Sequence, residues 1–213
     1  MSKTRVLLAD DHRIVIEGLK KLLEPEYDVV GTVEDGRALI AAVAELQPDV
    51  VVADISMPHL NGIEAVRQIK QKNPNIKVVM LTMHHDVQYA VRAFEAGASG
   101  FVLKVSAPNE LITAIGEARK GKTYVTPGIA GELIQSYREG KENPEVGFSR
   151  LSARQQEILQ LVAEGHSAKE IGKILSISAR TVESHKYQIM ELLNLKTTAE
   201  LVQFAIKHGI ISI

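Results

Sequence analysis

VVVADISMP, residues 50–58, is the stretch that decides the fold. It is an apolar run that reaches the carboxylate of Asp54, and loop-forming residues from Pro58 to Gly62 follow it. A short apolar run bounded by turn residues is typical of a strand buried on both faces of a parallel sheet. Ligands of open α/β sheets bind outside the carboxyl ends of the strands, where Asp54 would lie. Asp54 alone is equally typical of a helix or turn cap, so its meaning depends on the rest of the chain.

Further apolar segments on both sides of this stretch alternate with helical patterns. The spacing predicts five strands, each followed by a helix, at residues 5–9, 27–33, 49–53, 76–81 and 100–103. Short connections between such strands favour a parallel sheet, and right-handed crossovers make it doubly wound. We therefore expect a flavodoxin-like α/β domain with strand order 2-1-3-4-5.

Polar side chains stand where these strands end. Asp10 and Asp11 follow the first strand, Asp54 ends the third, Thr82 follows the fourth and Lys104 follows the fifth. The topology brings all of them to one edge of the sheet. Carboxylates that close repel one another unless a cation lies between them, and hard oxygen ligands suit Mg²⁺. A carboxylate beside Mg²⁺ and an ammonium group is a plausible nucleophile toward phosphorus.

This set of residues resembles the receiver domain of two-component response regulators, over residues 4–121. The resemblance implies that Asp54 accepts a phosphoryl group from a sensor histidine kinase. It also implies that Asp11, Asp54 and the Ser56 carbonyl hold Mg²⁺, with Asp10 helping through water. Thr82 and Lys104 would contact the phosphoryl oxygens, and Phe101 would be the aromatic switch that rotates inward when Thr82 moves.

Some residues near this edge depart from the common receiver pattern. Val105 stands where proline with a cis bond is usual, Met83 where a small residue is usual, and Phe101 where tyrosine is frequent. The first puts the loop geometry in question and the second predicts more crowded access to Asp54. Four histidines lie in these loops: His12, His59, His84 and His85. We interpret them as ordinary loop residues and not as metal ligands. His84 and Ser56 could still tune how water reaches the acyl phosphate.

The composition allows ordinary hydrophobic cores, since 45% of the 213 residues are hydrophobic. The net charge of −1 excludes a strong overall basic field, but residues 150–213 hold 8 Lys and Arg against 6 Asp and Glu, a local excess of +2. The chain has no Cys, which excludes disulfides and thiolate metal sites. Neither a signal peptide nor an apolar run of about 18 residues is present, so we expect a cytoplasmic protein without a membrane partner.

The composition changes after the last predicted strand and helix. A helix is expected from Pro127, and the residues from Arg138 to Ser149 are mostly polar and include Gly140, Pro144 and Gly147. We interpret residues 125–148 as a linker helix followed by a tether, between a receiver domain at 1–124 and a second domain at 149–213.

Residues 150–213 show helical periodicity throughout and predict an all-α domain of four helices. Capping-box patterns at Ser152–Gln155, Ser167–Glu170 and Thr197–Glu200 mark three helix starts. Only Ser176-Ile177-Ser178 separates the second helix from the third. Two helices joined by so short a turn favour a helix-turn-helix, in which the later helix enters the major groove of DNA.

The residues of this later helix fall into two stripes. Val182, His185, Ile189 and Leu192 form an apolar stripe assigned to the core, with His185 as a hydrogen-bonded core histidine. The opposite stripe and its flanks would contact double-stranded DNA through Lys169, Arg180, Thr181, Glu183, Ser184, Lys186 and Tyr187. Lys173 would also lie near phosphates. A small helical bundle with a solvated polar face would show the same pattern.

Short motifs in this half, including Leu151-Ser152-Ala153-Arg154 and Thr181-Val182-Glu183-Ser184-His185, resemble the LuxR-type output domain over residues 149–213. A receiver with this domain is the NarL/FixJ class of response regulator. The family often has Glu at position 155 and Lys at position 183, so Gln155 and Glu183 are departures; Glu183 could accept from a cytosine amino group. The resemblance also implies that the last helix supplies a dimer contact through Leu201, Phe204, Ala205 and Lys207.

Together these features predict a transcription regulator that is switched by phosphorylation of Asp54 and is not an enzyme beyond self-phosphorylation and self-dephosphorylation. Its partners would be a sensor histidine kinase, double-stranded DNA, a second copy when phosphorylated, and RNA polymerase. Two other classes stay open. One is a Mg²⁺-dependent phosphatase, which usually needs a second Asp where Ser56 stands. The other is a DNA-binding or protein-interaction module that works without phosphorylation.

Overall fold

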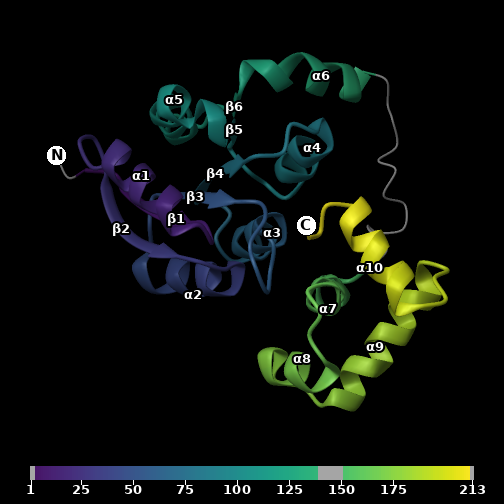
Figure 1. The fold of residues 1–213 in the computed structure, drawn as a ribbon. Coiled ribbons are helices and arrows are strands. Elements are labelled where there is room, and N and C mark those ends of the chain that lie inside the picture. The colour runs from purple at the N-terminus through teal and green to yellow at the C-terminus, as the bar shows by residue number, and fades with distance from the viewer. Residues whose placement is uncertain (1–2, 139–150, 212–213) are drawn as a thin grey trace. The chain divides into compact units, whose positions relative to one another are not determined.

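The computed structural model describes residues 3–138 and 151–211 (Figure 1). The chain divides into two compact units, Met1–Lys141 and Glu142–Ile213, which are described separately below as the N-terminal and C-terminal units.

The N-terminal unit is built on one parallel sheet with strand order β2-β1-β3-β4-β5-β6. The predicted flavodoxin-like order of the first five strands is confirmed. The predicted number is one too small, because β6 pairs with β5 through Gly100–Tyr124 and Phe101–Val125. The strands are β1 (Arg5–Ala9), β2 (Asp28–Val33), β3 (Val50–Asp54), β4 (Lys77–Thr82), β5 (Gly100–Leu103) and β6 (Tyr124–Val125).

Helices cover both faces of this sheet, so its central strand is apolar on both sides. Val51 and Ala53 of β3 face one core cluster, with residues of α2, α3, α4 and α6, while Val50 and Val52 face the other, with residues of α1 and α5. This is why the run at 50–53 shows no alternation in sequence. The helices are α1 (Arg13–Leu23), α2 (Gly36–Leu46), α3 (Gly62–Lys72), α4 (Val87–Glu95), α5 (Ala107–Arg119) and α6 (Pro127–Arg138), with a 3₁₀ turn, η1, at Lys104–Ser106.

Side-chain caps fix where several of these helices begin. The Asp35 carboxylate accepts hydrogen bonds from the backbone N–H groups of Arg37 and Ala38 at the start of α2. The Asn61 side chain accepts from the Glu64 N–H at the start of α3. Each cap holds a loop that follows the carboxyl end of a strand, where the candidate site lies.

Helix α6 packs against α4 within the N-terminal unit (Figure 1). Its Ile129 and Leu133 are buried in the same core cluster as Phe101 of β5. The helix expected at Pro127 therefore contributes to the core of this unit. The tether predicted between Arg138 and Ser149 lies outside the described residues, apart from Arg138 itself.

The C-terminal unit contains four helices in its described part, as predicted: α7 (Ala153–Ala163), α8 (Ala168–Leu175), α9 (Ala179–Leu192) and α10 (Thr198–Lys207). The capping boxes at Ser152 and Ser167 are present with both of their hydrogen bonds. The third predicted box is only half formed. Thr197 accepts from the Glu200 N–H, but the Glu200 carboxylate accepts from the Lys196 N–H and not from Thr197.

Two assignments of apolar residues in this unit need correction. Val182 and Ile189 of α9 are buried as predicted, but Leu192 is 44% exposed, because the helix ends there and the core does not reach its last turn. In α10, Leu201 and Ala205 are fully buried in the unit's own core. These two side chains are therefore not free for the contact between copies that the resemblance implied.

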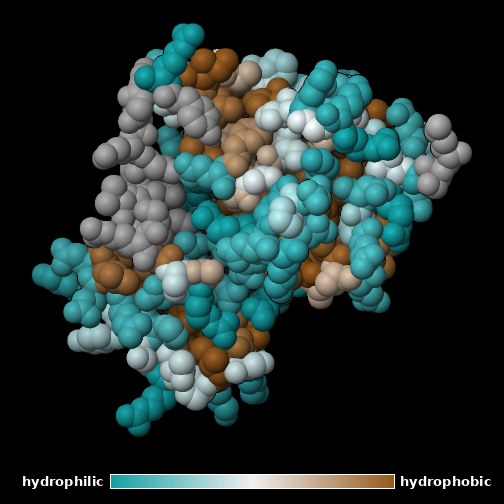
Figure 2. Space-filling model, turned by 180° about the vertical axis from the view of Figure 1, so that it is seen from behind, coloured by the Kyte–Doolittle hydropathy of each residue, from teal (hydrophilic) through white to brown (hydrophobic). Residues whose placement is uncertain are grey.

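The described surface carries few exposed large hydrophobic side chains. Figure 2 shows one face, on which hydrophobic residues form small, separate patches among hydrophilic ones. No helix within residues 3–138 and 151–211 is long and apolar enough to cross a membrane.

Candidate functional site

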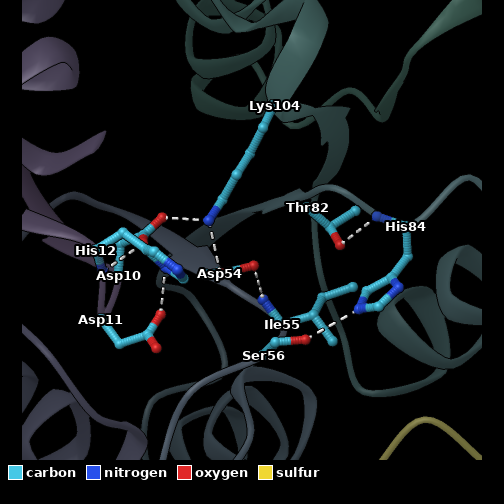
Figure 3. A network of polar contacts seen from close by, with 9 residues as sticks. All are labelled: Asp10, Asp11, His12, Asp54, Ile55, Ser56, Thr82, His84 and Lys104. Atoms are coloured by element: carbon cyan, nitrogen blue, oxygen red, sulfur yellow. Dashed lines mark hydrogen bonds and ion pairs between the residues drawn. The ribbon is translucent and has the colours of Figure 1, made fainter. Parts of the chain in front are cut away.

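The strand ends bring Asp10, Asp54 and Lys104 into direct contact (Figure 3). The Lys104 Nζ lies 2.6 Å from Asp10 Oδ2 and 2.7 Å from Asp54 Oδ2. These residues follow or end β1, β3 and β5, which run parallel, so their carboxyl ends share one edge of the sheet. The sequence predicted that they would gather there, and the structure places them within hydrogen-bonding distance.

Burial and charge act against each other in this cluster. Asp10 and Asp54 are only 1% and 4% exposed. Burial raises the pKa of Asp54 above its ordinary value, and the neighbouring Lys104 offsets only part of this effect. Burial also lowers the pKa of Lys104, but the contacts with Asp54 and Asp10 outweigh it and leave that pKa raised. Lys104 is therefore a firmly charged ammonium beside a carboxylate that is costly to ionise.

The loop after β3 holds the Asp54 carboxylate in place. Asp54 Oδ1 accepts a hydrogen bond from the Ile55 N–H at 2.7 Å. The Gly62 N–H donates to the Ile55 carbonyl at 2.8 Å, which folds the loop back onto the strand end. A Cβ atom at Gly62 would lie 1.9 Å from the Asp54 carbonyl oxygen, so only glycine fits there. Asp54 Oδ2 is left facing Lys104.

Asp11 and His12 complete the acidic edge. Asp11 is more exposed than Asp10, and its Oδ1 lies 2.8 Å from His12 Nδ1. Ligand atoms of Asp10, Asp11, His12 and Asp54 all lie within 4.8 Å of one another. This spacing and the carboxylate-rich donor set fit one small divalent cation such as Mg²⁺.

Thr82, Ser56 and His84 form a second group of contacts beside Asp54. The Thr82 side chain is fully buried, and its Oγ1 accepts from the His84 N–H at 3.1 Å. Ser56 Oγ and His84 Nε2 are 3.0 Å apart, and the His84 ring stacks on Tyr89 of α4 with ring centroids 4.3 Å apart. Burial lowers the pKa of His84. The sequence placed these residues near one another but gave no sign of this bridge between the β3 and β4 ends.

The residues that depart from the receiver pattern take ordinary positions. Phe101 is fully buried, so it already has the inward position that the resemblance assigned to the switched state. Val105 and Met83 are 69% and 66% exposed. Among the described residues no peptide bond is cis, and Val105 lies in the η1 turn that leads into α5.

One buried residue that the sequence analysis did not select joins this edge to α6. The Thr126 hydroxyl accepts a hydrogen bond from the Leu103 N–H at 3.1 Å and donates to Glu110 Oε2 of α5 at 2.7 Å. The Thr126 N–H donates to the Phe101 carbonyl at 3.0 Å. A threonine directly before Pro127 at a helix start was a signal for a cap, but its partners on β5 and α5 are distant in sequence.

The helix-turn-helix of the C-terminal unit has the predicted three-residue turn. Ser176 adopts a left-handed conformation with φ of 55°, and the Ser178 side chain caps α9 by accepting from the Thr181 N–H. A Cβ at Gly172 would lie 2.7 Å from the Ile177 carbonyl oxygen, so the two helices approach closely at a glycine. This turn fixes the position of α9 relative to α8.

The predicted DNA-facing residues lie on the surface of this unit. Six are exposed and Lys186 is half-buried, the exposed ones being Lys169, Arg180, Thr181, Glu183, Ser184 and Tyr187. The Thr181 hydroxyl is 2.8 Å from Ser178 Oγ and so belongs partly to the cap. Within the described residues Lys169, Arg180 and Lys186 form no ion pair, which leaves these cations available for phosphates.

His185 differs in one respect from the predicted core histidine. Its ring is only half-buried, and its Nδ1 is buried without a hydrogen-bond partner in the described part of the chain. The predicted hydrogen bond is therefore missing at this nitrogen.

Comparison with known proteins identifies both units. Residues 6–116 match the response regulator receiver domain, and residues 149–205 match the bacterial regulatory proteins of the luxR family. The transcriptional regulatory protein DegU of Brevibacillus brevis is 35% identical over 98% of this chain and 95% of its own length. The oxygen regulatory protein NreC of Staphylococcus carnosus is 35% identical over 97% of this chain and 99% of its own. The chain belongs to the NarL/FixJ class of response regulators.

Solved structures of response regulators agree with this assignment. The RcsB response regulator of Salmonella typhimurium matches with a TM-score of 0.60 and 32% identity over 96% of this chain and 98% of its own. A structure of an RcsB–DNA complex matches with a TM-score of 0.59 and 31% identity over 95% and 98% of the two chains. This response regulator thus consists of a receiver and a LuxR-type DNA-binding domain, and it is a regulator of transcription by family.

Proposed function

We propose that Asp54 accepts a phosphoryl group from a sensor histidine kinase and that this event controls DNA binding through α9. The observation that carries the proposal is the contact of Lys104 with both Asp54 and Asp10, at 2.7 and 2.6 Å. A buried carboxylate that shares an ammonium with a second acid is a poor structural ion pair but a suitable nucleophile toward phosphorus. We also propose the domain limits 1–124 for the receiver, 125–148 for a linker helix and tether, and 149–213 for the DNA-binding domain. The α6 part of this linker packs on the receiver core.

In the proposed reaction a carboxylate oxygen of Asp54 attacks the phosphorus of the donor phosphohistidine. The P–N bond breaks, and its electron pair returns to the imidazole of the donor. The residues Asp11, Asp54 and the Ser56 carbonyl would hold Mg²⁺, with Asp10 acting through water, and the ion would offset the charge of the phosphoryl oxygens. Lys104 would move from the two carboxylates to a phosphoryl oxygen.

Thr82 can report the new charge to the rest of the receiver. Its Oγ1 accepts from the His84 N–H, so its own O–H remains able to donate to a phosphoryl oxygen. Thr82 ends β4, and Phe101 lies on the neighbouring strand β5, opposite Met80 of β4. A shift of Thr82 would therefore disturb Phe101. The proposed outcome is a changed surface around β5 that promotes a homodimer or releases the DNA-binding domain. Two copies would then read half-sites about one helical turn apart, and a contact with RNA polymerase is compatible with this arrangement.

DNA recognition is proposed for the exposed side of α9. Arg180, Ser184 and Tyr187 would face base edges near the start of the helix, with Glu183 accepting from a cytosine amino group. Thr181, Lys169 and Lys186 would contact phosphates. The absence of ion-pair partners for Lys169, Arg180 and Lys186 in the described residues supports this role.

Incubation of the full chain with acetyl phosphate and Mg²⁺ tests the proposal. Mass spectrometry should find one added phosphoryl group on the wild-type protein and on Asp28→Asn, whose exposed carboxylate lies away from the cluster. Asp54→Asn should remain unmodified, because an amide is not nucleophilic enough. Modification of Asp54→Asn, or none of the wild type, would overturn the assignment. Rapid multiple turnover of the phosphodonor would instead indicate a phosphatase.

A further inference from the structure

An open hollow lies at the amino ends of β1, β3 and β4, on the edge of the sheet opposite to Asp54. Its volume is about 400 Å³, and its lining residues are Lys3, Thr4, Asp49, Asn75, Lys77 and Arg119. Thr4 and Asp49 directly precede β1 and β3, and Lys77 begins β4. The volume lies within the range of about 300–1,000 Å³ that is typical of small-molecule sites. Neither the proposed phosphorylation nor DNA binding uses this part of the receiver.

The lining of this hollow carries an excess of positive charge. Three cations, Lys3, Lys77 and Arg119, stand against the single carboxylate of Asp49, which gives a net charge of +2. Asp49 Oδ2 accepts a hydrogen bond from the Arg5 N–H at 2.8 Å, and Lys3 Nζ donates to a backbone carbonyl at 2.7 Å. Within residues 3–138 and 151–211 none of the three cations forms an ion pair. Their charge is therefore not neutralised by this part of the chain.

A neighbouring lysine shows that cations repel one another at this edge. Lys70 of α3 donates through Nζ to the carbonyl of Ile76, the residue before Lys77, at 2.6 Å. Burial lowers the pKa of Lys70, and the charge of Lys77 lowers it further. An anion beside Lys77 would relieve this repulsion, so the electrostatics of the edge favour a negatively charged ligand.

Neutral donors complete the lining. Thr4, which is only 7% exposed, contributes a hydroxyl group, and Asn75 contributes a side-chain amide. In the described part of the chain neither side chain forms a hydrogen bond. Ammonium, guanidinium, hydroxyl and amide groups together offer the several donors that phosphate oxygens accept. The guanidinium of Arg119 also suits bidentate contact with a phosphate group.

We propose that this hollow binds a small, multiply charged anion that carries phosphate groups, such as a phosphorylated metabolite. The inference does not depend on the proposed function, because it uses neither Asp54 nor α9. Two phosphate groups supply enough charge to offset the excess of the lining, so pyrophosphate should bind more tightly than inorganic phosphate. The length of β3 separates the hollow from Asp54, so the bound anion is a ligand of the receiver and not a phosphodonor.

Calorimetry with inorganic pyrophosphate and the full chain, freed of divalent ions, tests the proposal. The wild-type protein should bind one pyrophosphate, and Lys77→Gln and Arg119→Gln should each weaken binding about tenfold. Arg13→Gln is the matched control and should change the affinity less than about twofold, because Arg13 begins α1 at the opposite edge of the sheet. No binding to the wild-type protein, or equal weakening in Arg13→Gln, would overturn the proposal.

Two further measurements locate the anion and separate it from nucleic acid. In amide NMR spectra, pyrophosphate should shift the signals of Thr4 and Lys77 and leave those of Asp54 and Thr82 in place. Shifts confined to the Asp54 edge would rule out the hollow. Lys77→Gln should leave the affinity for DNA unchanged. A weaker affinity, with a salt slope smaller by about one for each copy, would assign the hollow to the DNA backbone and overturn the small-anion proposal.

Discussion

At the residue scale, burial of Asp54, the proposed phosphoacceptor, has an energetic cost. Its carboxylate is buried beside Asp10, and its pKa is raised chiefly by burial. A folded-state pKa above the unfolded value means that the folded protein holds the Asp54 proton more tightly. The associated stability is present below the ordinary pKa of an aspartate and is lost as pH rises through the raised value. At neutral pH the ionised Asp54 therefore lowers the free energy of unfolding, which is common at sites where function opposes stability.

Asp54→Asn should therefore stabilise the metal-free protein at neutral pH. The expected gain in unfolding free energy is on the order of 1 kcal/mol, because the amide carries no buried charge and Lys104 keeps its contact with Asp10. The gain should shrink as pH falls through the raised pKa of Asp54, because the wild-type carboxylate then becomes protonated. Denaturant titrations in a chelator at several pH values measure this difference. A gain that is equally large at acid pH, or that Asp28→Asn reproduces, would contradict it.

Sequence reasoning located the individual residues of the site better than their contacts. Asp10, Asp54 and Lys104 were predicted at one edge, because parallel topology alone brings strand ends together. The bond between Ser56 and His84 and the approach of His12 to Asp11 depend on loop geometry and rotamers, for which the sequence carries no periodic signal. Contacts between polar side chains of the loops are thus the part of the site that only the three-dimensional structure shows.

At the element scale, β6 and α6 are the parts that the sequence described least well. Two residues are too few to show strand periodicity, so Tyr124–Val125 could not be predicted as a strand. The helix at Pro127 was predicted, but not its packing, because Ile129 and Leu133 look like the sparse apolar residues of a linker until α4 is seen beside them. Thr126 connects these elements to β5 and α5 through three hydrogen bonds. The start of α6 is therefore tied to the strand that carries Phe101.

Thr126→Val should loosen this connection without changing side-chain shape. The Leu103 N–H and the Glu110 carboxylate would each lose a buried partner, at a cost of about 1–3 kcal/mol in unfolding free energy. Hydrogen exchange should become faster at the Leu103 amide and along α6. Thr113→Val, an exposed threonine on α5, is the matched control and should change stability by less than about 0.5 kcal/mol. Unchanged exchange at Leu103 in Thr126→Val would mean that the hydroxyl does not hold the two elements together.

At the scale of the whole molecule, the uneven charge separates the tasks of the two halves. The chain carries −1 in total, while residues 150–213 carry 8 basic against 6 acidic side chains. Attraction to DNA must therefore come from the local surface of the C-terminal unit and not from the whole chain. A weakly basic single copy makes few phosphate contacts, so pairing of two copies is the simplest way to add more. If phosphorylation pairs two copies, as one branch of the proposed function has it, the pair brings more basic surface to DNA than one copy.

The salt dependence of DNA binding should report that number directly. Each phosphate contact contributes about −0.9 to the slope of log affinity against log salt, so a dimer should show about twice the slope of a monomer. We expect the steeper slope for wild-type protein with a phosphodonor and the shallower slope for Asp54→Ala under the same conditions. Lys169→Ala should reduce the steeper slope by about 2, one contact in each copy, whereas Lys122→Ala on the receiver should not change it. Filter binding or fluorescence anisotropy over a range of salt concentrations measures all four proteins. Equal slopes with different affinities would contradict phosphorylation-driven pairing, because a change in affinity without new phosphate contacts requires release of an already competent C-terminal unit.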